Sequence, residues 1–176
     1  QTEETLIIGN GCFWCTEAVF QRLKGVSKVE SGFSGGHIKN PAYREITTGR
    51  TGHAEVIKLT YNPEIISFKD LLRIFFATHD PTTLNRQGYD TGTQYRSAIF
   101  FRDEREEKIA REIIEEVQPL FDDPIVTEVT PVSPFYKADQ EHQDFYNKNT
   151  ESPYCQAVIN PKLGKLRSLF QSKLQD

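Results

Sequence analysis

The sequence predicts an α+β protein built on a ferredoxin-like βαββαβ core. Over residues 5 to 101 the expected elements follow the order strand, helix, strand, strand, helix, strand, which is a split βαβ pattern. A chain of 176 residues, 37% hydrophobic and 26% charged, is long enough to bury its own core. No linker, repeat or low-complexity tract divides it. We therefore expect one domain that covers residues 1–176.

Hydrophobic periodicity and turn residues define the first six elements. Short apolar runs or alternation indicate the strands, and apolar residues at helical spacing indicate the helices. Gly11 ends the first strand, Gly25 stops the first helix and Pro63 stops the third strand. Ser67, with Asp70 three positions later, resembles a helix capping box. In order, we expect strand 5–9, helix 12–23, strand 26–33, strand 53–61, helix 67–76 and strand 96–101.

The rest of the chain predicts more helix than strand. Asp103 with Glu106 caps a strongly charged amphipathic helix. Two long polar loops, around residues 34–52 and 79–94, have the length at which loops usually carry function. After an irregular stretch a helix closes the chain. In order, we expect helix 103–121, strand 125–132, helix 139–147 and helix 161–174.

Composition excludes several classes of function. The net charge of −4 and the sequence pI near 5.6 give no sign of a nucleic-acid or anionic-membrane partner. No apolar run approaches the length of a membrane span. The N-terminal residues lack the pattern of a signal peptide, so we expect a cytoplasmic protein. We also expect a monomer.

The most informative segment is Gly11-Cys12-Phe13-Trp14-Cys15, where a strand ends and a helix begins. A helix N-terminus stabilises an anion, so this position should lower the pKa of Cys12 and make it a nucleophilic thiolate. Phe13 and Trp14, the only tryptophan, could form an apolar cup for a small uncharged group.

Other interpretations of the cysteines remain open at this point. A C-x-x-C pair is half of a zinc site, but the remaining candidates, Cys155 and four scattered histidines, show no pair at metal-ligand spacing, so we expect no metal. Cys15 could be a small core residue or a redox partner of Cys12.

Further candidates for chemistry lie on a predicted strand and in the two polar loops. Glu55 sits among apolar residues, and burial beside the thiol would raise its pKa and make it a general acid. Alternation alone does not decide whether it faces the core or solvent. The loops offer Asp90, Tyr95 and Tyr43 as polar groups for a ligand, although loop tyrosines usually only pack.

Taken together, these segments resemble the A-type peptide methionine sulfoxide reductases. The resemblance covers residues 5–159. It rests on ordered motifs at Gly11–Trp14, Ser34–His37, Asn40–Tyr43, Gly52–Glu55, His79–Thr82, Asn85–Gly88 and Gly92–Ser97.

The resemblance implies a fold and a role for each candidate. The fold would be a two-layer α+β sandwich or roll with a mixed sheet on the ferredoxin-like core, with a C-terminal irregular segment and helix. Cys12 would attack the sulfoxide sulfur, and Glu55 would protonate its oxygen. Tyr43 and Tyr95 would donate hydrogen bonds to that oxygen. Asp90 would organise the polar side of the substrate pocket, and Phe13 and Trp14 would form the wall that holds the methyl group of the substrate.

The implied reaction reduces methionine S-sulfoxide, free or in proteins, and needs no cofactor. It leaves a sulfenic acid on Cys12, which a second thiol converts to a disulfide that thioredoxin reduces. Family members often supply that thiol from the C-terminal region, so we favour Cys155 over Cys15. The segment 156–162 replaces a glycine-rich tail with what looks like a strand.

Two other classes of function remain as alternatives. The first is a general thiol–disulfide oxidoreductase that uses Cys12 and Cys15, which would not need Glu55. The second is a peptide-binding module that holds methionine side chains in the aromatic cup. It leaves the adjacent nucleophile and acid unexplained.

Overall fold

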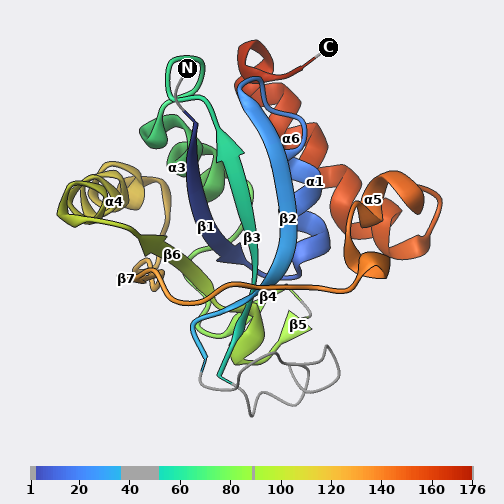
Figure 1. Cartoon of the computed structure of the whole chain (residues 1–176), viewed down its shortest axis with the longest axis horizontal. Coiled ribbons are helices and arrows are strands. Elements are labelled where there is room, and N and C mark those ends of the chain that lie inside the picture. Colours follow the sequence, from blue (N-terminus) through green and yellow to red (C-terminus); the bar gives the residue numbers. More distant parts are fainter. Residues whose placement is uncertain (1–2, 37–51, 89, 176) are drawn as a thin grey trace.

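The structure, a computed structural model, describes residues 3–36, 52–88 and 90–175 and is built around one mixed sheet (Figure 1). The strand order is β7-β6-β1-β3-β2-β8. Within it, the four strands β6-β1-β3-β2 pair antiparallel, which is the ferredoxin-like order. The outer strand β7 pairs parallel to β6, so the sheet is mixed as expected. The strands are β1 Glu4–Asn10, β2 Val26–Ser34, β3 Ala54–Tyr61, β6 Ser97–Phe101, β7 Glu128–Pro131 and β8 Tyr136–Lys137.

Helices cover one face of this sheet, and shorter elements line the loops. A two-stranded hairpin, β4 Arg86–Gln87 with β5 Asp90–Thr91, forms within the second polar loop. The α-helices are α1 Phe13–Phe20, α3 Phe68–Ala77, α4 Glu104–Val117, α5 Phe145–Lys148 and α6 Asn160–Phe170. In the described part of the chain, 3-10 turns lie at Thr93–Tyr95, Gln118–Leu120, Gln140–His142 and Gln171–Lys173, and a π-helical turn, η4, spans Cys155–Ile159.

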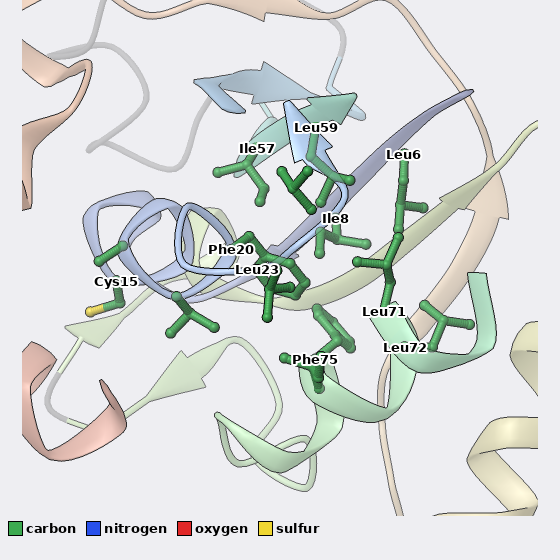
Figure 2. Packing of buried hydrophobic residues seen from close by; sticks show 14 of the residues in the cluster. Leu6, Ile8, Cys15, Phe20, Leu23, Ile57, Leu59, Leu71, Leu72 and Phe75 are labelled. Carbon is green, nitrogen blue, oxygen red and sulfur yellow. The ribbon is translucent and has the colours of Figure 1, made fainter. Parts of the chain in front are cut away.

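The main core lies between the sheet and helices α1 and α3 (Figure 2). Alternate residues of β1, Leu6 and Ile8, point into it, whereas Ile7 between them belongs to a small cluster on the opposite face. Phe20 of α1 and Phe75 of α3 meet these strands and are fully buried. Each such side chain contributes on the order of 1.5–3 kcal/mol of burial free energy. This packing holds α1, and with it the cysteine motif, rigidly against the sheet.

The opposite face of the sheet is covered by the chain that enters β8. In Figure 1 this segment runs across the strands from β7 towards α5. Phe135 packs on the small apolar cluster there. Gly32 of β2 allows the close approach, because a Cβ atom at this position would lie 2.5 Å from the Phe135 ring. The crossing delivers residues 140–148 to the side of α1.

Most element boundaries agree with the sequence, and the helix caps are confirmed. Ser67 accepts a hydrogen bond from the Asp70 N–H at 3.0 Å, and Asp103 accepts one from the Glu106 N–H at 2.9 Å.

The expectation fails in the last third of the chain. The expected helix 139–147 is a 3-10 turn and the short α5, separated where Asp144 adopts a left-handed backbone with φ 57°. The expectation of a strand at residues 156–162 is also wrong, because this segment forms the π-helical turn η4 and the start of α6. There Pro161 lies in the first turn, where its missing N–H is harmless. Within the described ranges, no helix has the length and apolarity needed to cross a membrane.

Candidate active site

Cys12 sits at the junction of β1 and α1. Gly11 makes the turn with φ 118°, and a side chain there would also collide with Gln87. Cys12 is the N-cap residue of α1, and its carbonyl accepts the N–H of Cys15 at 3.0 Å. Its side chain is buried, with 7% exposed. The strand-to-helix position predicted from the sequence is therefore confirmed.

Glu55 lies on β3 and faces the same side of the sheet as α1. Its strand neighbours Ala54 and Val56 belong to the cluster on the other face, which fixes the orientation that alternation left open. The side chain is 0% exposed. Its Oε1 accepts the backbone N–H of Phe13 at 3.1 Å, and the carboxyl group interacts electrostatically with the Cys12 thiol. Glu55 is therefore an immediate neighbour of the candidate nucleophile.

The surroundings of Glu55 keep it protonated at neutral pH. Burial raises the pKa of its carboxyl group from 4.5 to about 8, and the charge of Asp90 adds to the increase. The hydrogen bonds from Phe13 and Cys12 oppose this effect without cancelling it. Among the described residues, the second carboxyl oxygen has no hydrogen-bond partner. A neutral carboxyl group beside a thiol is what a general acid requires.

The expected low pKa of Cys12 is wrong for the reduced protein. Burial raises the pKa of the Cys12 thiol well above its ordinary value, and the nearby Glu55 and Cys15 add to the increase. Hydrogen bonds from Tyr154 and the Trp14 N–H lower it by less. The first backbone N–H of α1, that of Phe13, is bound to Glu55, so this donor does not stabilise the sulfur. The resting pair is a neutral thiol next to a neutral acid.

Tyr154 is a site residue that sequence reasoning missed. Its hydroxyl lies 3.3 Å from the Cys15 Sγ and donates to Oδ2 of Asp90 at 3.4 Å. It also interacts electrostatically with the thiol of Cys12. The only signal in the sequence was its position directly before Cys155. One hydroxyl thus joins the α1 thiols, the polar loop and the C-terminal segment.

The loop after α3 places Asp90 on a short strand and Tyr95 in a 3-10 turn. Asp90 begins β5 and is partly buried; burial raises the pKa of its carboxyl group, and the bond from Tyr154 opposes this. Tyr95 ends a 3-10 turn and packs against the edge of the main core. Tyr43 lies outside the described residues. The roles of all three remain predictions.

The aromatic pair after Cys12 divides into a core residue and a wall of the site. Phe13 is fully buried and packs on Phe33 with ring centroids 5.6 Å apart. Trp14 is partly buried and stacks on Phe145 with centroids 3.8 Å apart and an interplanar angle of 8°. The Trp14 Nε1–H donates to Nδ1 of His142 at 3.3 Å. Sequence reasoning missed Phe145 and His142, because residues 139–147 were interpreted only as a helix.

The three cysteines are reduced and buried. Cys15 is 4% exposed and Cys155 is 0% exposed at the start of η4, where its N–H binds the Ser152 Oγ at 3.1 Å. Burial raises the pKa of Cys15, whereas the charge of Lys162 lowers it. In the described ranges, no three His, Cys, Asp or Glu side chains are grouped as metal ligands.

A buried thiol next to a protonated carboxyl group, at the start of a helix on a ferredoxin-like core, defines a thiol-dependent oxidoreductase. The family model of peptide methionine sulfoxide reductase matches residues 4–174. The chain belongs to the peptide methionine sulfoxide reductase family.

Individual relatives agree with this assignment. The chain is 51% identical over 172 residues to a peptide methionine sulfoxide reductase MsrA from Saccharolobus solfataricus, covering 98% of this chain and 97% of the relative. Reduced Mxr1 from Saccharomyces cerevisiae has a similar structure, with TM-score 0.81, 34% identity and coverage of 87% and 89%. Mxr1 in complex with Trx2 is similar at TM-score 0.57 and 27% identity, with coverage of 81% and 84%.

Proposed function

We propose that this chain reduces methionine S-sulfoxide, free or within proteins, to methionine, with Cys12 as nucleophile and Glu55 as acid. Membership of the family supports the reaction. The observation that carries the residue roles is the contact between Cys12 and a fully buried Glu55 that keeps its proton to about pH 8. A sulfoxide oxygen is a poor leaving group until it is protonated, so an acid at this position lowers the barrier.

The chemical step transfers one oxygen atom from substrate to enzyme. The Cys12 sulfur attacks the sulfoxide sulfur while Glu55 gives its proton to the sulfoxide oxygen, and the thiol proton replaces it on the carboxyl group. The attack forms a bond between the Cys12 sulfur and the substrate sulfur, which now carries a hydroxyl group. The hydroxyl group then passes to the Cys12 sulfur as the S–O bond of the substrate and the new S–S bond both break. The products are methionine and a sulfenic acid on Cys12, so the substrate sulfur is reduced and the cysteine sulfur is oxidised.

The aromatic wall suits the uncharged end of the substrate. Trp14, flanked by Phe145 and His142, offers an apolar surface for the methyl group. Burial lowers the pKa of His142, which favours the neutral ring that accepts the Trp14 N–H. We assign hydrogen bonding of the sulfoxide oxygen to Tyr43 and Tyr95, and organisation of the polar side to Asp90 through Tyr154.

Recycling requires a second thiol and an external dithiol. Condensation of the sulfenic acid with a thiol forms a disulfide and releases water, and dithiol exchange then restores Cys12. Cys155 is our proposed resolving residue, and Cys15 is the alternative, because Cys15 interacts electrostatically with both of the other thiols. Thioredoxin is the proposed reductant, supported by the complex of the similar Mxr1 with Trx2.

A general thiol–disulfide exchanger is the weaker assignment. Such enzymes present an exposed cysteine of low pKa to their partners. Here burial raises the pKa of both Cys12 and Cys15. A buried acid such as Glu55 is also not needed for exchange.

We further propose that the chain acts as one domain and as a monomer. We propose the cytoplasm as its place of action, since the thioredoxin pool there is kept reduced.

Racemic dabsyl-methionine sulfoxide with dithiothreitol as reductant tests the reaction. Consumption of half of the substrate is expected, because the chain acts on the S epimer. No turnover would contradict the assignment, and complete consumption would contradict the stereochemistry. A disulfide substrate under the same conditions should be reduced no faster than by dithiothreitol alone.

A further inference from the structure

Glu17 is a buried acidic residue that the proposed reaction does not use. It lies on α1 one helical turn after Trp14 and is 2% exposed. Glutamate is rarely buried to this extent unless it has partners that account for its position. Its partners belong to the segment around α5, which lies beside α1 (Figure 1).

The carboxyl group of Glu17 binds the backbone at the start of α5. Its Oε2 accepts the N–H of Asp144 at 2.8 Å. Asp144 has the left-handed backbone with φ 57°, which is uncommon for residues other than glycine although aspartate adopts it more readily than most. Gln21, one turn further along α1, donates to Oδ1 of Asp144 at 2.9 Å. Side chains of α1 and of its C-cap residue therefore hold the turn in place.

The turn that Glu17 holds carries two of the three ring partners of Trp14, and the third, Tyr154, packs edge-on against the indole from the C-terminal segment. Phe145 directly follows Asp144 and stacks on the indole, with centroids 3.8 Å apart. His142, two residues before Asp144, accepts the indole N–H. A change at the Asp144 turn would therefore move the stacking ring and the hydrogen-bond acceptor of Trp14 together.

Fold stability alone does not explain a carboxyl group at this position. Oε1 of Glu17 is buried and has no hydrogen-bond partner among the described residues, which makes its burial costly. An apolar side chain would avoid this cost but could not accept the N–H of Asp144. The observed contacts favour a role in the geometry of the turn.

We propose that Glu17 is a positioning residue that holds the 142–145 turn against α1 and thereby sets the orientation of Trp14 in the substrate-binding wall. This inference rests on the proposed function of Trp14. It assigns Glu17 no contact with the substrate.

The test compares Glu17→Ala, Glu17→Asp and Glu17→Gln with a matched control, Glu106→Ala. Glu106 is equally buried, at 1% exposed, and accepts a backbone N–H from Arg102 at 2.8 Å, but it lies on α4. Trp14 is the only tryptophan of the chain, so intrinsic fluorescence reports on this ring alone. The second readout is the separation of KM from kcat for methionine sulfoxide with dithiothreitol.

Glu17→Ala should move the emission to longer wavelength and increase acrylamide quenching about twofold, because the indole loses its ordered ring partners. KM should rise about tenfold, while kcat changes less than about threefold. Glu17→Asp should do the same, since its shorter side chain keeps the charge but does not reach the turn. Glu17→Gln keeps one acceptor oxygen and should recover most of the parent behaviour.

Parent-like emission and KM in both Glu17→Ala and Glu17→Asp would overturn the proposal, as would equal changes in Glu106→Ala. If Glu17→Ala fails to fold, the Asp and Gln variants decide the question by the same two readouts. If the parent itself does not reduce the sulfoxide, the proposed function fails, whereas the fluorescence comparison still tests the role of Glu17.

Discussion

The backbone N–H of Phe13 donates a hydrogen bond to Oε1 of Glu55 at 3.1 Å and joins residues 42 positions apart in the chain. This N–H belongs to the first turn of α1, where a donor without an intrahelical partner usually stabilises an anion. Here the bond fixes the carboxyl group next to Cys12. Burial nevertheless keeps that carboxyl group protonated at neutral pH. The helix start therefore positions the acid and leaves the thiol neutral.

Glu55 should make the protein less stable as the pH rises. Its pKa is 4.5 when exposed and about 8 in the fold, so the folded protein holds one proton more than the unfolded chain between these values. The free energy of unfolding therefore falls across this range. The Glu55→Gln variant lacks this titration. Its free energy of unfolding minus that of the parent should therefore increase between pH 4.5 and 8 by on the order of 2–4 kcal/mol. Urea denaturation of both proteins at pH 5 and pH 8 measures this difference.

The same titration should limit activity at high pH. The parent should lose kcat as the pH rises through about 8, where Glu55 gives up its proton. Glu55→Gln should be about 100-fold slower but free of this pH dependence, and Glu55→Ala should be slower still. A stability difference that stays constant with pH, or equal rates for the three forms, would contradict the role of Glu55.

Cys12 should be unreactive in the resting enzyme and essential for the reaction. Because burial raises the pKa of its thiol, iodoacetamide should modify it slowly at pH 7. Cys12→Ser should release no methionine in a single turnover without reductant. Cys15→Ser, with the neighbouring thiol removed, is the matched control and should release one equivalent. Methionine release by Cys12→Ser would show that another group is the nucleophile.

The hydroxyl of Tyr154 should ease ionisation of the thiols around it. Its hydrogen bonds lower the pKa of Cys12 and Cys15, so Tyr154→Phe should shift the pH profile of thiol alkylation upwards. We expect about a tenfold loss of kcat with dithiothreitol, in line with the loss of one hydrogen bond to a developing charge.

Tyr146→Phe provides the control for this change. Tyr146 lies on α5 and donates its hydroxyl proton to Asn160, and among the described residues this hydroxyl makes no hydrogen bond to a cysteine. Its variant should keep the alkylation profile and kcat of the parent. If the two phenylalanine variants behave alike, Tyr154 has no special relationship with the thiols.

Local sequence patterns predicted the parts of the fold that depend on neighbouring residues. Alternation in β1 separates Leu6 and Ile8 from Ile7, and Ser67 caps α3, because both effects act within a few positions. The positions of Cys12 and Glu55 followed from the motifs that carry the family resemblance.

The missed features depend on contacts between distant segments. The raised pKa of Cys12 arises from burial by the assembled fold, which a helix-start argument does not contain. Tyr154 reaches Cys15 across 139 positions, and His142 reaches Trp14 across 128. The break at Asp144 is held by Glu17 from α1, so no local pattern could have divided the expected helix there.

The choice between Cys155 and Cys15 as resolving thiol has separate expected outcomes. Cys155 is fully buried in η4, and the adjacent Tyr154 is bonded to Cys15 and Asp90. If Cys155 resolves the sulfenic acid, Cys155→Ser should release one methionine and then stall with thioredoxin. It should keep turning over with dithiothreitol, a small dithiol that reduces the sulfenic acid directly.

Cys15→Ser is the matched comparison, since it removes the other buried thiol. If Cys15 resolves the sulfenic acid, this variant should stall with thioredoxin and Cys155→Ser should behave as the parent. If the disulfide passes from Cys15 to Cys155, both variants should stall, and mass spectrometry of the parent should show a Cys12–Cys15 bridge before a second one. Normal turnover of Cys155→Ser with thioredoxin would refute our assignment of Cys155, because a buried thiol that is not used in the cycle would then serve only in packing.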